Sequence, residues 1–206
     1  MKITLDTKTL TFVAAVLALV VPLVAAATNG PSNAANKTAA AGSTVEFLSP
    51  LAPATTILAT TIKTSAPQDL ILSVTSECAL WTTVATTGND ESIARATVQV
   101  WVEFDGVPVP VSGSGDDGKV VFCDRLHRQT VTDLDDDDAR IEQYLATRTA
   151  NGFNWLLPDA GSGVHTIEVK ADLTSETTGA DALAQAGVGH RTLIVEPTHL
   201  AQGFTL

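Results

Sequence analysis

The four histidines are the first residues to test for chemistry, because imidazole serves both acid–base catalysis and metal binding. They are widely spaced, at His127, His165, His190 and His199. The chain contains neither a His-Glu-x-x-His motif nor a Gly-x-Ser-x-Gly nucleophile motif. His165 falls on the expected inner face of a strand, which favours a hydrogen-bonded core residue over a catalyst. The sequence therefore predicts a non-catalytic protein, and a secreted hydrolase whose carboxylates meet only in the fold is the less favoured alternative.

A run of aspartates is the candidate metal site. Asp133, Asp135 and Asp137 alternate as at the start of a calcium loop, where side chains one, three and five converge on one ion. The sixth position is Asp138 where an EF-hand needs Gly, and the twelfth is Tyr144 where it needs Glu. An EF-hand is therefore excluded. A solvated acidic loop is the favoured interpretation, and a looser calcium site is the alternative.

Two cysteines, Cys78 and Cys123, both lie in expected strand interiors. In an exported chain an even number of cysteines indicates a disulfide, and two isolated cysteines lack the close pairing of a zinc site. We therefore expect a Cys78–Cys123 bond, with two buried free thiols as the alternative.

Tryptophan is the candidate binding residue. Trp101 shares its parity with Gln99 and Glu103 in a strand whose even positions are apolar, and Trp81 likewise falls on the polar side of its strand. Such a ring is covered either by a partner or by the chain itself, for example by the Gly/Ala-rich segment 174–189. If a partner covers them, Trp81 and Trp101 form a recognition surface, and Gln99 and Glu103 orient the ligand.

The elements that position these residues follow an export signal. Residues 1–11 carry two lysines, the uncharged run 12–27 is shorter than a membrane-spanning helix, and it ends in three alanines. This pattern predicts a signal peptide over 1–27, with an uncleaved anchor as the alternative. Residues 28–43 lack large apolar side chains and are expected to form a flexible tether, which leaves 44–206 as the folded domain.

The composition limits which folds and which classes of partner are possible. Of the 206 residues, 45% are hydrophobic and only 17% are charged, and 29 Thr outnumber 12 Lys plus Arg. This composition favours strands. The net charge of −11 argues against a nucleic-acid partner, which requires a basic patch.

Alternating patterns predict eight or nine short strands and no amphipathic helix. Even positions are apolar over 70–80, except for Ser76, and again over 96–104, and Asp105-Gly106 follows as a hairpin turn. The prolines at 108 and 110 mark an edge strand. Such a chain is expected to form an all-β, two-sheet antiparallel sandwich of jelly-roll type.

The segment 153–169 resembles the late strands of many extracellular jelly-roll modules. Its aromatic strand, its glycine turn at 161–163 and its His-Thr-Ile-Glu-Val strand precede a last strand at 193–195. Complement-C1q-like, tumour-necrosis-factor-like and carbohydrate-binding jelly rolls share this pattern. The resemblance implies a fold and, because these modules have unrelated functions, no particular activity.

These observations favour a secreted or cell-surface protein that acts without catalysis, by self-association or by binding another extracellular protein. The alternative is a carbohydrate-binding module that uses an exposed Trp to hold a glycan. We expect no cofactor apart from the calcium considered above, no membrane span once the leader is removed, and a homo-oligomer as one form of association.

The leader prediction can be tested by mass. Cleavage after Ala27 removes Lys2, Lys8 and Asp6, so the mature chain begins at Thr28 with a net charge of −12. Intact-mass spectrometry of the exported protein should give the mass of residues 28–206. A mass that still includes residues 1–27 would contradict the signal-peptide interpretation.

Overall fold

The structure is a computed structural model, and it describes residues 37–87, 90–113, 115–132, 140–179 and 181–200. Within these ranges every regular element is a strand. The ten strands are β1 (Thr38–Gly42), β2 (Glu46–Leu48), β3 (Thr55–Thr64), β4 (Gln68–Thr87), β5 (Glu91–Phe104), β6 (Val107–Pro108), β7 (Val120–Thr130), β8 (Arg140–Ala160), β9 (Gly163–Thr178) and β10 (Leu183–Thr198).

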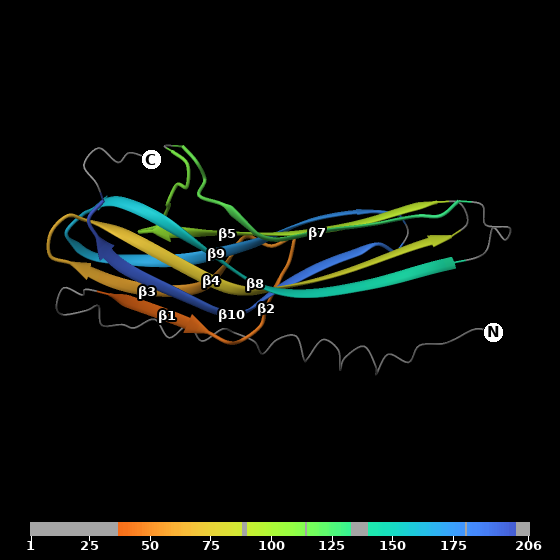
Figure 1. Cartoon of the computed structure of the whole chain (residues 1–206), viewed down its shortest axis with the longest axis horizontal. Helices are drawn as coiled ribbons and strands as arrows, with labels where there is room; N and C mark the ends of the chain where they lie inside the picture. The colour runs from red at the N-terminus through yellow and green to blue at the C-terminus, as the bar shows by residue number, and fades with distance from the viewer. Residues whose placement is uncertain (1–36, 88–89, 114, 133–139, 180, 201–206) are drawn as a thin grey trace, which may run out of the picture.

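The strands form two antiparallel sheets packed face to face (Figure 1). Sheet A has the order β1-β10-β4-β8, and β2 pairs with β10 next to β1. Sheet B has the order β3-β9-β5-β6, and β7 also pairs with β5. Strands β4 and β7 end, and β5 and β8 begin, at the same end of the molecule, on the right in Figure 1. The predicted all-β, two-sheet antiparallel sandwich is confirmed.

Period-two patterning decides which side chains enter the space between the sheets. In β4 the even positions from Leu70 to Leu80 are buried and the odd positions are more exposed. In β5 the even positions from Ala94 to Val102 are buried in the same way. The expected parity of both strands is confirmed, because each sheet has one face toward the core and one toward solvent.

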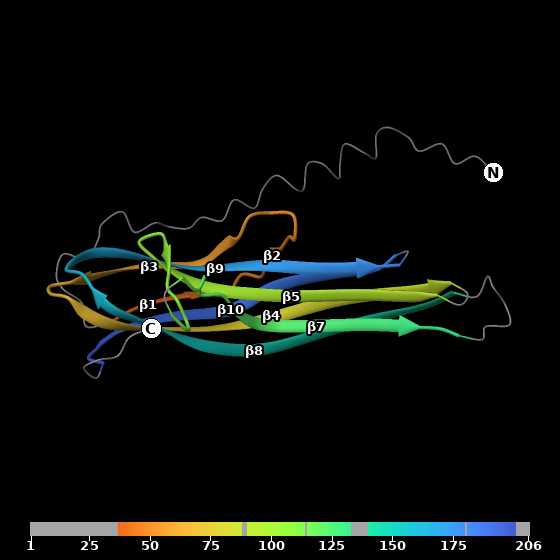
Figure 2. The same ribbon diagram turned by 90° about the horizontal axis from the view of Figure 1, so that it is seen from above.

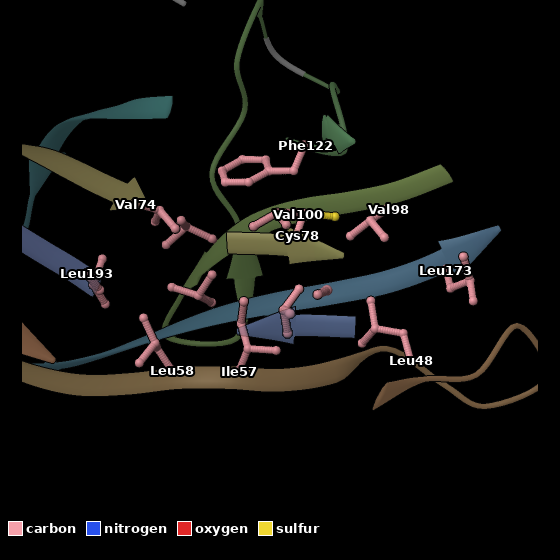
Figure 3. Close-up of a cluster of buried hydrophobic side chains, with 14 of the residues drawn as sticks. Leu48, Ile57, Leu58, Val74, Cys78, Val98, Val100, Phe122, Leu173 and Leu193 are labelled. Atoms are coloured by element: carbon pink, nitrogen blue, oxygen red, sulfur yellow. The ribbon is translucent and has the colours of Figure 1, made fainter. Parts of the chain in front are cut away.

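The hydrophobic core draws side chains from both sheets. Figure 3 shows Val98 and Val100 of β5 close to Cys78 and Phe122. Trp155, the largest fully buried side chain, donates its indole N–H to the carbonyl of Gly118 at 2.8 Å. This bond satisfies a donor that burial would otherwise leave without a partner. Gly118 adopts φ +70° where a Cβ would lie 2.2 Å from the Val109 carbonyl oxygen, so only glycine fits.

The expected disulfide between Cys78 and Cys123 is confirmed, with Cα atoms 6.4 Å apart. Cys78 is in the middle of β4 in sheet A, and Cys123 is in β7 at the side of sheet B. The bond therefore links the two layers covalently. A disulfide is compatible with an extracellular location.

Buried Arg191 links its own strand, β10, to two other segments. Its Nε donates to the carbonyl of Ile57 at 2.7 Å, and its Nη1 donates to the carbonyls of Thr44 at 2.6 Å and Gly189 at 2.9 Å. Burial lowers the pKa of the guanidinium, and nearby Glu46 opposes that shift. These bonds attach β10 to the start of β3 and to the connection between β1 and β2.

Two segments differ from the expected organisation. Residues 38–42, placed in the tether, form β1 and pair with β10, since small side chains do not prevent backbone pairing at a sheet edge. The Gly/Ala-rich segment 174–189 continues β9 and begins β10, so it is not available as a covering loop. Small residues suit this part of β10, where Ala184 and Ala186 are buried.

Other predictions fall outside the described residues, namely the signal peptide, the first part of the tether and the aspartate run 133–138. In the part of the chain that the structure describes, no helix is long and apolar enough to cross a membrane.

Loss of the disulfide is expected to destabilise the sandwich. Replacing both cysteines with alanine should lower the free energy of unfolding by about 2–4 kcal/mol, mainly because the unfolded chain is released from a closed loop. Urea denaturation of this variant and of reduced wild type should give the same lowered midpoint. An unchanged midpoint, or two free thiols in the unfolded, unreduced protein, would contradict the prediction.

Candidate functional site

The two candidate tryptophans lie on opposite faces of the sandwich. Trp81 is in β4 of sheet A, and Trp101 is in β5 of sheet B. Both have the parity that points away from the core, as predicted. The chain crosses from one sheet to the other between β4 and β5, so the rings cannot belong to one surface. The prediction that Trp81 and Trp101 form one recognition surface is therefore wrong, because the two rings lie on separate faces.

Trp101 is enclosed by charged side chains of its own chain and is only 7% exposed. The Lys119 ammonium lies 4.6 Å from the ring centroid, a cation–π contact. The indole N–H donates to Glu103 Oε1 at 3.1 Å, and Lys170 Nζ lies 3.6 Å from Glu103 Oε2. The chain does cover this ring, although with Lys119 rather than with residues 174–189. Of the two alternatives, cover by the chain itself therefore holds for Trp101, and an open recognition surface at this ring does not.

Gln99 and Glu103 do not act together on the outer face of sheet B. Gln99 lies between Asp172 of β9 and Val121 of β7, and Asp172 accepts a 2.8 Å hydrogen bond from Lys119. Glu103 is already bonded to Trp101. Glu103 and Asp172 stabilise this face by their ionic and hydrogen-bond contacts, whereas Gln99 is a half-exposed polar group beside them.

Trp81 belongs to a different environment, because its ring meets Phe47 from β2. The two ring centroids are 5.7 Å apart, and Phe47 is 73% exposed. Gly187 of β10 lies between the strands that carry these rings, where a Cβ would come within 3.4 Å of both Trp81 Cζ3 and Val45 Cγ1. The missing side chain of Gly187 lets the indole lie across β10 and reach Phe47.

Strand register extends this apolar surface across sheet A. Thr83 is opposite Leu183 of β10 and opposite Tyr144 of β8, so both lie diagonal to Trp81 on the same face. Tyr144 is 63% exposed and Leu183 is 47% exposed. We define the aromatic patch as Val45, Phe47, Trp81, Tyr144 and Leu183.

Charged groups of both signs flank the aromatic patch. On one side Glu77 contacts Arg148 and accepts a 2.9 Å hydrogen bond from His190 Nδ1. Hydrogen bonds from Arg148 and then His190 lower the pKa of Glu77 to about 2, so this carboxylate is ionised at neutral pH.

On the other side Arg140 lies 3.2 Å from both Glu142 and Asp181. Each flank thus pairs its positive groups with negative ones. The surface around the patch is therefore more balanced than the acidic chain as a whole.

His165 is part of an Asp–His–Thr arrangement that has the outline of a catalytic triad. Its Nδ1 lies 2.8 Å from Asp105 Oδ2, and its Nε2 lies 3.3 Å from Thr64 Oγ1. However, Nε2 also donates to the carbonyl of Gly161 at 2.9 Å, and Thr64 is buried and itself donates to that carbonyl. With both ring nitrogens donating, His165 cannot act as a base toward Thr64. It is the hydrogen-bonded core residue that the sequence predicts.

The candidate calcium ligands Asp133, Asp135 and Asp137 lie outside the described residues. Among the described residues, no group of three or more His, Cys, Asp or Glu is arranged to hold a metal ion. Asp116 accepts hydrogen bonds from Ser112 and from the backbone N–H of Gly118, which lower its pKa. The Asp116 carboxylate therefore stabilises the turn in which it lies.

Of the patch residues, sequence reasoning identified only Trp81, and the two aromatic residues that it missed are Phe47 and Tyr144. The exposed parity of Tyr144 follows from the alternation over 141–149. Phe47 carries no such signal, because β2 is only three residues long and its pairing with β10 spans most of the chain.

Searches against models of known protein families and against curated proteins find no match to this chain. The function must therefore be argued from the site itself.

The Asp105–His165 pair predicts a pH-dependent stability. Burial lowers the pKa of His165, but the hydrogen bonds with Asp105 and Gly161 outweigh burial and raise it above 6.5. A raised folded-state pKa stabilises the protein fully below the unfolded pKa, and this stability is lost as the pH rises through the folded pKa.

We expect Asp105→Asn to lower the pKa of His165 in an NMR titration and to flatten the fall in unfolding free energy above pH 6.5. Because Asn also tolerates the φ of 52° at position 105, the substitution should leave the turn itself unchanged. A His165 pKa unchanged in this variant would contradict the assignment.

Proposed function

We propose that this chain is an exported, non-catalytic protein of the cell surface or extracellular matrix that acts by association, with itself or with another extracellular protein. The observation that carries the proposal is the aromatic patch on sheet A, which no other part of the described chain covers. The predicted leader and a disulfide that links the two sheets agree with export.

The proposal extends to the fold, which we assign to the jelly-roll type. Four pairings support this assignment, because they are nested in chain order: β1–β10, β3–β9, β4–β8 and β5–β7. Nested pairing is what results when one long antiparallel hairpin is rolled up. The additional pairs β4–β10 and β5–β9 then join neighbouring turns of the roll.

The patch has the physical properties of a binding surface. Phe47 and Tyr144 keep most of their side-chain area in water, although burying a side chain of this kind contributes about 1.5–3 kcal/mol. Aromatic residues dominate binding energy at interfaces because they bury a large, rigid area. The paired charges at both flanks let a second acidic molecule approach here with less repulsion than elsewhere.

A carbohydrate ligand is the second candidate, and one observation favours it. Trp81 lies on the outer face of sheet A, where Gln185 is directly opposite it. A sugar ring that stacks on the indole would find hydrogen-bonding groups at its rim.

Phe47→Ala tests the proposed surface. Because Phe47 is largely exposed, the free energy of unfolding should change by less than about 0.5 kcal/mol. We expect the variant to associate at least about tenfold more weakly than wild type, as measured by light scattering over a concentration series. Leu126→Ala is the matched control, since Leu126 is 60% exposed on the opposite face.

The same variants on a glycan array separate the two candidates. Glycan retention by wild type that Phe47→Ala or Trp81→Ala abolishes would favour the carbohydrate ligand over protein association. If these variants match the wild type in both association and glycan retention, the patch is not a binding surface and the proposal fails.

A further inference from the structure

Most edges of the two sheets carry features that prevent pairing with another chain. On sheet A the edge formed by β1 and β2 is short and broken between them. On sheet B the β3 edge has a register shift between Thr56 and Leu58, and the β6 edge contains Pro108. Strand β7 has a register shift opposite Val98 and Gln99 and carries three charged residues at 124, 125 and 128. Short strands, irregularities, prolines and charges are how natural proteins protect sheet edges.

Strand β8 is the exception. It pairs only with β4, lies at the end of sheet A, and runs along one long side of the molecule (Figure 2). Its pairing with β4 has no register shift between Leu70 and Thr87, and its single proline, Pro158, lies near its far end. Every residue from 140 to 151 is exposed. A long and regular edge is a template for pairing with another strand, and the charged residues of this edge, at 140, 142 and 148, are of both signs.

We propose that β8 pairs with β8 of a second copy of this chain, antiparallel and about a two-fold axis at Leu145. This inference rests on the self-association in the proposed function but uses the edge of β8, which shares only Tyr144 with the aromatic patch. The two copies form one continuous sheet in which β8 of each is no longer an edge. Strand addition of this kind satisfies the free backbone groups of residues 140–150.

Charge complementarity selects this register. A two-fold axis perpendicular to the sheet keeps each face continuous, so a residue must pair with one of the same parity. Centring the pair on Leu145 places Glu142 opposite Arg148 of the second copy, twice by symmetry, on the outer face. Moving the centre to Tyr144 places Arg140 opposite Arg148 instead, and these like charges repel.

The inner face of the pair agrees with this register. Leu145 meets Leu145 of the second copy, and Ile141 meets Thr149 of that copy. Ile141 is 38% exposed and Leu145 is 42% exposed, so both gain burial when the copies associate.

Pairing has a consequence for the aromatic patch. Because the axis is perpendicular to the sheet, both patches face the same side, and each Tyr144 lies at the seam opposite Ala146 of the other copy. A dimer therefore presents two patches on one continuous face. A partner with repeated binding sites is then held bivalently, which strengthens binding without new contacts.

Substitution at the axis tests the proposal. We expect the mature wild-type chain to be a dimer by sedimentation equilibrium. Leu145→Lys and Leu145→Glu each place like charges opposite one another, and each should raise the dimer Kd at least about tenfold. An equimolar mixture of the two variants should restore the dimer, because Lys then faces Glu. Leu126→Lys, on the β7 edge, is the control and should leave the Kd unchanged.

Cysteine crosslinking tests the register. Leu145→Cys places two thiols directly opposite one another, within the range of a disulfide, so mild oxidation should give a covalent dimer. Thr147→Cys, on the same face of β8, lies opposite Gln143 of the second copy and should crosslink poorly. Equal crosslinking at both positions would overturn the register.

The outcomes separate this inference from the proposed function. A monomeric wild type, or a dimer that Leu145→Lys does not weaken, overturns pairing through β8 and leaves the patch untouched. Phe47→Ala should keep the dimer and lose only further association or ligand binding. If Phe47→Ala abolishes the dimer and Leu145→Lys does not, the patch is the dimer surface and this inference is wrong.

Discussion

The unbroken pairing of β4 with β8 determines most of the other features of this molecule. From Leu70 to Thr87, each residue of β4 has a fixed partner in β8. That register turns Cys78 inward, where it reaches Cys123, and turns Trp81 outward. A slip of one residue would exchange these faces and would lose the disulfide, the core and the aromatic patch together.

The two outer faces of the sandwich have different chemistry because their aromatic rings have different neighbours. On sheet B, Lys119, Glu103 and Lys170 enclose Trp101 in charged contacts, so that face is complete within one chain. On sheet A, the neighbour of Trp81 is the exposed ring of Phe47. Most of the apolar area at this position stays in water, so association is expected through sheet A rather than through sheet B.

Sequence patterns were sufficient for properties that depend on local alternation. They predicted the all-strand chain, the outward parity of Trp81 and Trp101, the turn at Asp105-Gly106 and the disulfide. The expected eight or nine short strands are instead ten among the described residues, and β4 and β8 are 20 and 21 residues long. They failed where long-range pairing decides the outcome. The parity of a strand does not show which sheet it joins. The sequence therefore did not reveal that β4 and β5 belong to different sheets. The cover over Trp101 comes from Lys119, and the partner of Trp81 comes from Phe47, 34 residues away; neither contact has a local signal.

The space between the sheets beside the aromatic patch is unusually polar. Thr82 and His127 are buried there and share a 3.4 Å hydrogen bond, and His127 also bonds Gln143 of β8. Thr86 and Gln129, also buried, each retain an oxygen without a hydrogen-bond partner among the described residues. Such an interior contributes less to stability than the apolar cluster around Trp155. The disulfide lies next to this region, where a covalent link offsets the weaker packing. The same region carries the patch and the free edge of β8. A partner that buries either surface therefore adds stability to this polar part of the fold, so association and folding stability are coupled here.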